Sequence, residues 1–116
     1  MSRDDATLLD LVQSARRVLE FKGDLDETAF NEDRKTQAAI LHELMIIGEA
    51  VRRLSTEFKN QRPEVPWKKI AGMRDKLIHQ YDHVDLEEVW STISSDVPNL
   101  LFHLSPRATG PDKDKP

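Results

Sequence analysis

The sequence predicts an all-α protein, folded as an antiparallel bundle of four main helices. Apolar residues recur every three or four positions over long stretches, which is the spacing of amphipathic helices. The chain has only four glycines and six prolines, and runs of β-branched residues are scarce. Its 116 residues, 38% of them hydrophobic and 33% charged, fit one domain with a modest core. Because so small a core is often supplemented by a second subunit, we expect a dimer.

The first predicted helix covers residues 4–22. At helical spacing its apolar face carries Leu8, Val12, Ala15 and Leu19. Gly23 directly after it is a natural stop. Residues 24–31 then form a connector with room for one helical turn.

The second predicted helix is long and covers residues 33–60. Its apolar stripe consists of Leu41, Leu44, Met45, Gly48, Val51, Leu54 and Phe58. Gly48 lies inside that stripe, where glycine costs about 1 kcal/mol relative to alanine, so we expect another helix to pack closely there. Two prolines within residues 61–66 end the helix.

The third predicted helix begins near Trp67 and continues to Tyr81, and the fourth begins at Asp85. Asp85 is a strong N-cap, and Glu88 three residues later completes an acidic variant of the capping box. Pro98 should kink the fourth helix or end its regular part. We expect the helical domain to span residues 1–104, followed by a disordered tail over residues 105–116 that is polar and rich in proline.

The composition excludes several classes of protein. There is no cysteine, so disulfides and thiolate metal sites are impossible. No apolar run approaches the roughly 18 residues that span a membrane, and the N-terminus lacks a signal-peptide core. We therefore expect a cytoplasmic protein with no membrane partner.

The net charge of −4 is unevenly distributed. Residues 52–76 contain eight basic and three acidic side chains, whereas residues 82–96 contain five acidic side chains and no lysine or arginine. The basic segment is either a surface for an anionic partner or an ordinary solvated helix face. Charge alone does not decide between the two.

The octapeptide RDKLIHQY, residues 74–81, is the best candidate for a functional site. The histidines show no metal-binding spacing, and the chain has no P-loop, dinucleotide-binding or nucleophile-elbow motif, so no metal or cofactor is expected. On a regular helix Asp75 can touch His79, but Arg74 and His79 lie about 140° apart. Arg74 and His79 can contact the same small group only if the helix loosens near His79 or a second subunit contributes one of the two residues.

Several motifs, in order, resemble HEPN-domain toxins of the HepT type. RDKLIHQY fits the R-x4-H-x-Y motif of that family, and the segments LMIIGEAVRRLS (44–55), PEVPWKKIAGMRD (63–75) and VDLEEVWSTISSDVPNL (84–100) are similar to its second, third and fourth helices. The resemblance covers about residues 4–104. It implies a helical bundle that dimerises and brings two such motifs to one cleft.

The resemblance also implies an activity and a partner. The family acts as metal-independent endoribonuclease toxins, with a nucleotidyltransferase of the MNT type as antitoxin. Transferred onto this sequence, Arg74 and His79 would be catalytic, Asp75 would support them, and Tyr81 would be the tyrosine that the antitoxin adenylylates. The flanking cations expected to hold the RNA backbone are Arg52, Arg53, Lys68, Lys69 and Lys76.

A second interpretation stays open. A helical bundle of this kind could be a non-catalytic binding module, serving as the partner or modification substrate of a nucleotidyltransferase without cutting RNA. The presence of both Arg74 and His79 favours the enzyme. Glu49, within the segment similar to the second helix, is expected to pair with an arginine across the bundle in a structural role.

Overall fold

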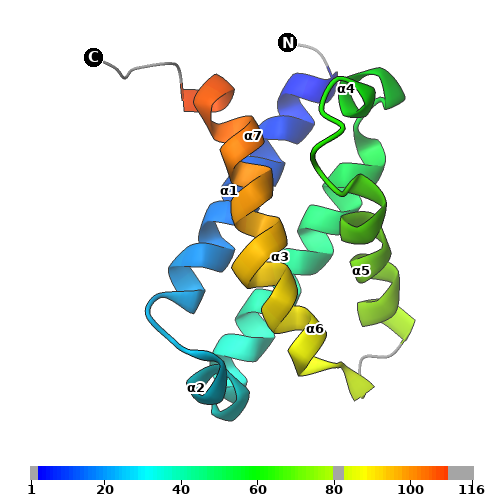
Figure 1. Cartoon of the computed structure of the whole chain (residues 1–116). Helices are drawn as coiled ribbons and strands as arrows, with labels where there is room; N and C mark the ends of the chain where they lie inside the picture. The colour runs from blue at the N-terminus through cyan, green and yellow to red at the C-terminus, as the bar shows by residue number, and fades with distance from the viewer. Residues whose placement is uncertain (1–2, 80–82, 110–116) are drawn as a thin grey trace.

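A computed structural model of the chain describes residues 3–79 and 83–109, with the side chains of 3–77 and 83–104. Its elements in chain order are α1 (Arg3–Lys22), α2 (Glu27–Glu32), α3 (Arg34–Arg53), α4 (Thr56–Asn60), α5 (Trp67–His79), α6 (Leu86–Ser91), the π-helical segment η2 (Thr92–Asp96) and α7 (Val97–Thr109). Four long rods run alternately up and down: α1, α3, α5 and the continuous α6–η2–α7 (Figure 1). The predicted all-α bundle is confirmed.

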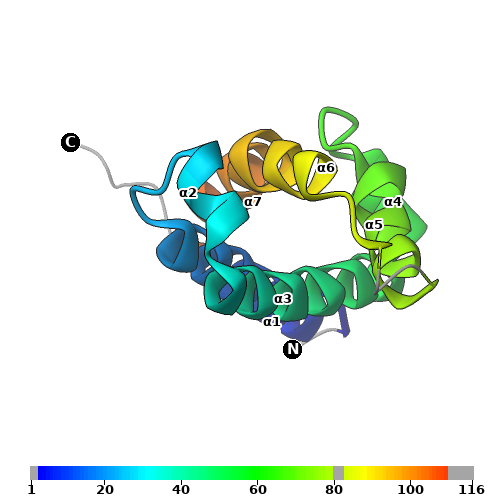
Figure 2. The same ribbon diagram turned by 90° about the horizontal axis from the view of Figure 1, so that it is seen from below.

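The rods surround one apolar core. Helix α1 packs against α3 and α7, and α3 packs on its other side against α5. Seen from below, α1 and α3 form one side of the bundle, α6 and α7 the other, and α5 closes one edge (Figure 2). Fully buried core side chains include Leu11, Val18, Phe30, Ile40, Ile47, Ile93 and Leu100. In the described part of the chain, no helix combines the length and apolarity needed to cross a membrane.

The predicted helix boundaries hold at three termini. Gly23, just after α1, adopts the left-handed φ of +52° that a glycine stop allows. Asp33 caps α3, accepting a hydrogen bond from the Thr36 backbone N–H at 3.0 Å. Asp85 caps α6 in the same way for Glu87 and Glu88. The Glu88 carboxylate pairs instead with Lys76 on α5. Of the expected capping box, the described contacts therefore include the hydrogen bonds to the Asp85 side chain but no return bond to Glu88.

The prediction of one helix over residues 33–60 is wrong at Leu54 and Ser55. Leu54 is extended, with φ −68° and ψ 144°, and Ser55 caps the separate helix α4 by accepting from the Phe58 N–H at 3.0 Å. Asp4 at the start of α1 fixes this break from across the bundle. Its carboxylate accepts from the Ser55 backbone N–H at 3.0 Å and from the Ser55 hydroxyl at 2.7 Å. These hydrogen bonds lower the pKa of Asp4 below its usual 3.8.

The irregularity expected near Pro98 lies in the turn before it. The five residues of η2 are π-helical, and the Val97 N–H donates to the Thr92 carbonyl five residues back. Because proline has no N–H, the regular i to i−4 ladder cannot continue through Pro98, and the wider turn accommodates the gap. The rod then resumes as α7. It continues to Thr109, beyond the expected domain end at residue 104, and residues 110–116 of the predicted tail lie outside the described residues.

At Gly48, α3 and α5 approach each other so closely that a side chain would not fit between them. A Cβ atom built on Gly48 would lie 2.3 Å from the Arg74 Cβ and 3.4 Å from the Arg74 Cα. No real Cβ tolerates such a contact, so any larger residue would push the two helices apart. The close packing expected at Gly48 is confirmed.

Replacing Gly48 by alanine should therefore destabilise the fold. Overpacking costs about 1–3 kcal/mol, and better helix propensity offsets about 1 kcal/mol of it. The matched control is Gly72→Ala in α5, where a new Cβ meets no atom within 4 Å and should stabilise by up to about 1 kcal/mol. Chemical denaturation measures both changes; a Gly48→Ala variant that gains as much stability as Gly72→Ala would contradict the close approach.

Candidate active site

Arg74 is the residue of the R-x4-H-x-Y motif whose side chain the structure describes. It lies in the middle of α5, and the first carbons of its side chain pack on Gly48 of α3. Its side chain is 32% exposed, so the stem is covered while the guanidinium reaches the surface. The absence of a side chain at position 48 therefore determines the position of the Arg74 side chain between the two helices.

The guanidinium belongs to a chain of alternating charges. Its Nε lies 3.1 Å from Oε1 of Glu49, and its Nη1 lies 3.3 Å from Oδ1 of Asp75. The other oxygen of Asp75 pairs closely with Arg52. The pairing of Glu49 with an arginine across the bundle is thus confirmed. Two carboxylates and two guanidiniums balance in this cluster, so Arg74 is oriented and already compensated.

A pocket of about 340 Å³ opens where the Arg74 side chain reaches the surface of α3. Its lining comprises His42, Met45, Ile46, Glu49, Arg53 and Arg74. Met45 and Ile46 are partly buried and give the pocket an apolar wall, while Arg53 brings a second guanidinium beside Arg74. An anion between two guanidiniums, with an apolar group next to it, would match this lining.

The structure describes less of His79 and nothing of Tyr81. His79 is the last residue of α5, and its side chain lies outside the described residues, as does the whole of Tyr81. Helix α5 is α-helical up to His79, so the angle of about 140° between Arg74 and His79 around the helix axis is kept. The described partners of Asp75 are Arg74 and Arg52. Its expected contact with His79 stays a prediction.

The five cations expected to hold RNA differ in their surroundings. Arg53 shares the pocket of Arg74, whereas Arg52 and Lys68 line a different pocket with Asp75. Lys69 pairs with Asp96 of η2 at 2.8 Å, and Lys76 pairs with Glu88 of α6 at 2.5 Å. The acidic segment of the fourth rod therefore neutralises part of the basic segment.

Sequence reasoning missed Lys59 and Trp67 as candidate site residues. Both line the same surface pockets as Lys68. Lys59 belongs to the basic segment, but it was expected to continue the long second helix. The break at Ser55 instead puts it on α4, opposite the start of α5.

Comparison with known proteins gives consistent results. The model of the Ribonuclease HepT-like family matches residues 11–105. A Methanocaldococcus jannaschii protein, provisionally named as an RNase, is 40% identical over 94 residues, covering 81% of this chain and 78% of its own. A Thermococcus cleftensis protein, provisionally named ribonuclease HepT, is 41% identical over 93 residues, covering 80% and 84%. No solved structure matches significantly.

Proposed function

The chain belongs to the HepT-like ribonuclease family, and from this premise we propose that it is an endoribonuclease, the toxin of a toxin–antitoxin pair. The observation that carries the proposal is the extent of the family match, which includes all of residues 74–81 and their R-x4-H-x-Y pattern. The oriented guanidinium of Arg74 beside an open pocket supports it. RNA is the proposed substrate, and the cytoplasm the proposed location.

The proposed reaction uses the nucleophile that RNA itself carries. The 2′-oxygen attacks the adjacent phosphorus, and the bond to the 5′-oxygen of the next nucleotide breaks, leaving a 2′,3′-cyclic phosphate and a free 5′-hydroxyl. His79 moves the proton, as base for the 2′-hydroxyl or as acid for the departing oxygen. Arg74 binds the scissile phosphate and stabilises the charge that grows on it. Asp75 keeps Arg74 in place, and neither a metal ion nor another cofactor is required.

We propose that the complete site forms between two copies of the chain. Positions 74 and 79 lie about 140° apart around a regular helix, so a residue from a second copy would complete the pair. The partly buried Met45 and Ile46 beside Arg74 offer apolar surface for such a contact. The RNA backbone would then follow Arg53 on one side of Arg74 and Arg52 and Lys68 on the other, with Lys69 and Lys76 further along.

The proposed antitoxin is a nucleotidyltransferase of the MNT type that modifies Tyr81. It would transfer adenylate from ATP to the phenolic oxygen and release pyrophosphate. Tyr81 stands two residues after His79, so the added nucleotide would put bulk and negative charge beside the catalytic histidine. Both effects would keep RNA out of the site.

The ribonuclease proposal predicts cleavage in the presence of EDTA. The purified chain, free of antitoxin, should cut RNA and leave cyclic phosphate ends. His79→Ala should lower the rate about 10²–10⁴-fold, and Arg74→Ala about 10²-fold or more. Arg34→Ala, at an exposed arginine near the start of α3, is the matched control and should cut normally. If the wild type cuts no better than the His79 and Arg74 variants, the binding-module interpretation replaces the enzyme.

A site shared by two copies predicts complementation between inactive variants. When Arg74→Ala and His79→Ala chains are mixed in equal amounts and allowed to exchange, each mixed dimer holds one site with both residues intact. Random pairing makes half of the dimers mixed, so about a quarter of the wild-type activity should return. A site within one chain would give none, because every chain in the mixture is defective. Activity of the mixture against its two components is the measurement.

The modification proposal predicts a specific change in mass. Incubation with the MNT-type enzyme and ATP should add adenylate to the wild-type chain, and intact mass spectrometry should detect it together with loss of RNA cleavage. Tyr81→Phe should stay unmodified and active, since only the phenolic oxygen is removed. Modification that persists in Tyr81→Phe would show that another residue is the acceptor.

A further inference from the structure

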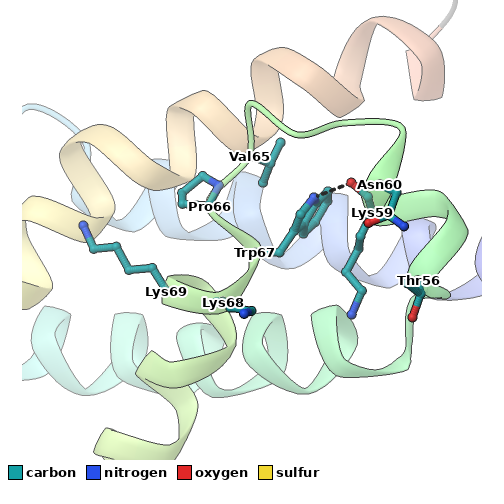
Figure 3. Close-up of a pocket in the computed structure, with 8 residues that line it drawn as sticks. All are labelled: Thr56, Lys59, Asn60, Val65, Pro66, Trp67, Lys68 and Lys69. Atoms are coloured by element: carbon teal, nitrogen blue, oxygen red, sulfur yellow. Dashed lines mark hydrogen bonds between the residues drawn. The ribbon is translucent and has the colours of Figure 1, made fainter.

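A second surface feature, a groove between α4 and α5, is not explained by the motif. It consists of two adjoining pockets, of about 520 Å³ and about 300 Å³, which share Lys59, Trp67 and Lys68. The larger pocket lies between α4, the turn after it and the first residues of α5 (Figure 3). The smaller one continues along α5 to Asp75 and Arg52. The groove therefore leads from Asp75, the residue after Arg74, to a pocket large enough for a small organic ligand.

One wall of the groove is flat and apolar. Trp67 stands in the larger pocket with Val65 and Pro66 beside it (Figure 3). Its indole N–H donates to the carbonyls of Lys59 and Arg62, both at 3.0 Å. The only polar atom of the indole is thus used within the fold. What Trp67 can offer to a ligand is carbon surface, which suits the face of another ring.

The other side of the groove is basic. Lys59, Lys68 and the Asp96-paired Lys69 line the larger pocket, and Arg52 joins Lys59 and Lys68 in the smaller one. Asp75 is the one acidic residue among the described lining residues, and it is already shared by Arg52 and Arg74. Lys68 is exposed and forms no ion pair with any described side chain. The groove combines positive charge with a flat apolar wall.

We propose that this groove is a nucleotide subsite, in which one base of single-stranded RNA lies against Trp67 and Pro66 while its phosphates lie near Lys68 and Lys59. The proposal rests on the ribonuclease function and names how the substrate is held beside the scissile bond. Ring stacking with lysines along the backbone is how proteins hold single strands without reading their sequence. A strand that leaves Arg74 past Asp75 and Arg52 enters this groove directly. A polyglutamate segment would use the lysines but has no ring for the apolar wall.

Binding can be measured apart from cleavage with RNA that is 2′-O-methylated, because the blocked 2′-oxygen cannot attack. Lys68→Glu should weaken the binding of a short 2′-O-methyl oligonucleotide about tenfold. Lys35→Glu makes the same charge change at an exposed position near the start of α3, at the other end from α4, and should change the Kd by less than about twofold. Equal effects of the two substitutions would overturn the subsite.

The base contact has its own optical signal. The chain has two tryptophans, and Trp90→Phe leaves Trp67 as the sole indole emitter. Oligonucleotides that carry bases should quench its fluorescence, whereas an abasic strand of equal length and charge should not, and should bind about tenfold more weakly. Equal quenching by both strands, or none by either, would overturn the base contact.

These measurements separate this subsite from the ribonuclease function. If unmodified RNA is cut in EDTA but Lys68→Glu and Lys35→Glu bind alike, the groove proposal fails and the enzyme stands. If the Lys68-dependent binding and quenching occur but no RNA is cut, the groove is a nucleotide site and the ribonuclease proposal fails. If a polyglutamate peptide binds in a Lys68-dependent manner and RNA does not, the groove takes an acidic protein segment and the nucleotide subsite is wrong.

Discussion

The contact between Gly48 and Arg74 is the constraint on which the site depends. Because position 48 has no side chain, α5 approaches α3 closely enough for the Arg74 stem to lie on the backbone of α3. That position brings the guanidinium within 3.1 Å of Glu49, the next residue along α3. A single glycine thus couples the packing of two helices to the orientation of a charged group. A wider spacing between the helices would preserve a bundle but would release Arg74 from Glu49.

The ion pairs with Glu49 and Asp75 explain how the Arg74 guanidinium can be held in one orientation and still bind a phosphate. Glu49 and Asp75 are each about half exposed, and ion pairs at such exposure contribute at most about 1 kcal/mol. A phosphate could therefore replace a carboxylate at the guanidinium without a large loss of stability. The carboxylates orient the guanidinium before the anion arrives, which reduces the ordering cost of binding. The same balance means that the positive charge available for long-range attraction comes from other cations, chiefly Arg53 and Lys68, which have no described ion pair.

Sequence reasoning was most successful where the information is local. The four long helical segments were predicted from helical spacing and from the residues at their ends, such as Gly23 and Asp85. Each of these signals lies within a few residues of the feature that it predicts. It failed at Leu54, since the break there is held by Asp4, 51 residues away from Ser55. It also could not foresee the ion pairs of Lys69 with Asp96 and of Lys76 with Glu88, because no local pattern places the fourth rod beside these lysines. Glu49 could be anticipated as a partner of an arginine, but which arginine required the packing of α3 against α5.

The break at Ser55 links the fold to the groove and shows why the groove could not be read from the sequence. The expected helix to Asn60 would leave no turn at Ser55 and therefore no separate α4. Ending α3 at Arg53 lets α4 turn back, so that the Lys59 and Arg62 carbonyls accept from Trp67 and the Lys59 ammonium donates to the Val51 carbonyl at 3.2 Å. The apolar wall and the basic side are therefore joined by the same few hydrogen bonds. Asp4 holds the break through Ser55, although it does not line the groove. A substitution at Asp4 would therefore alter the groove by shifting α4.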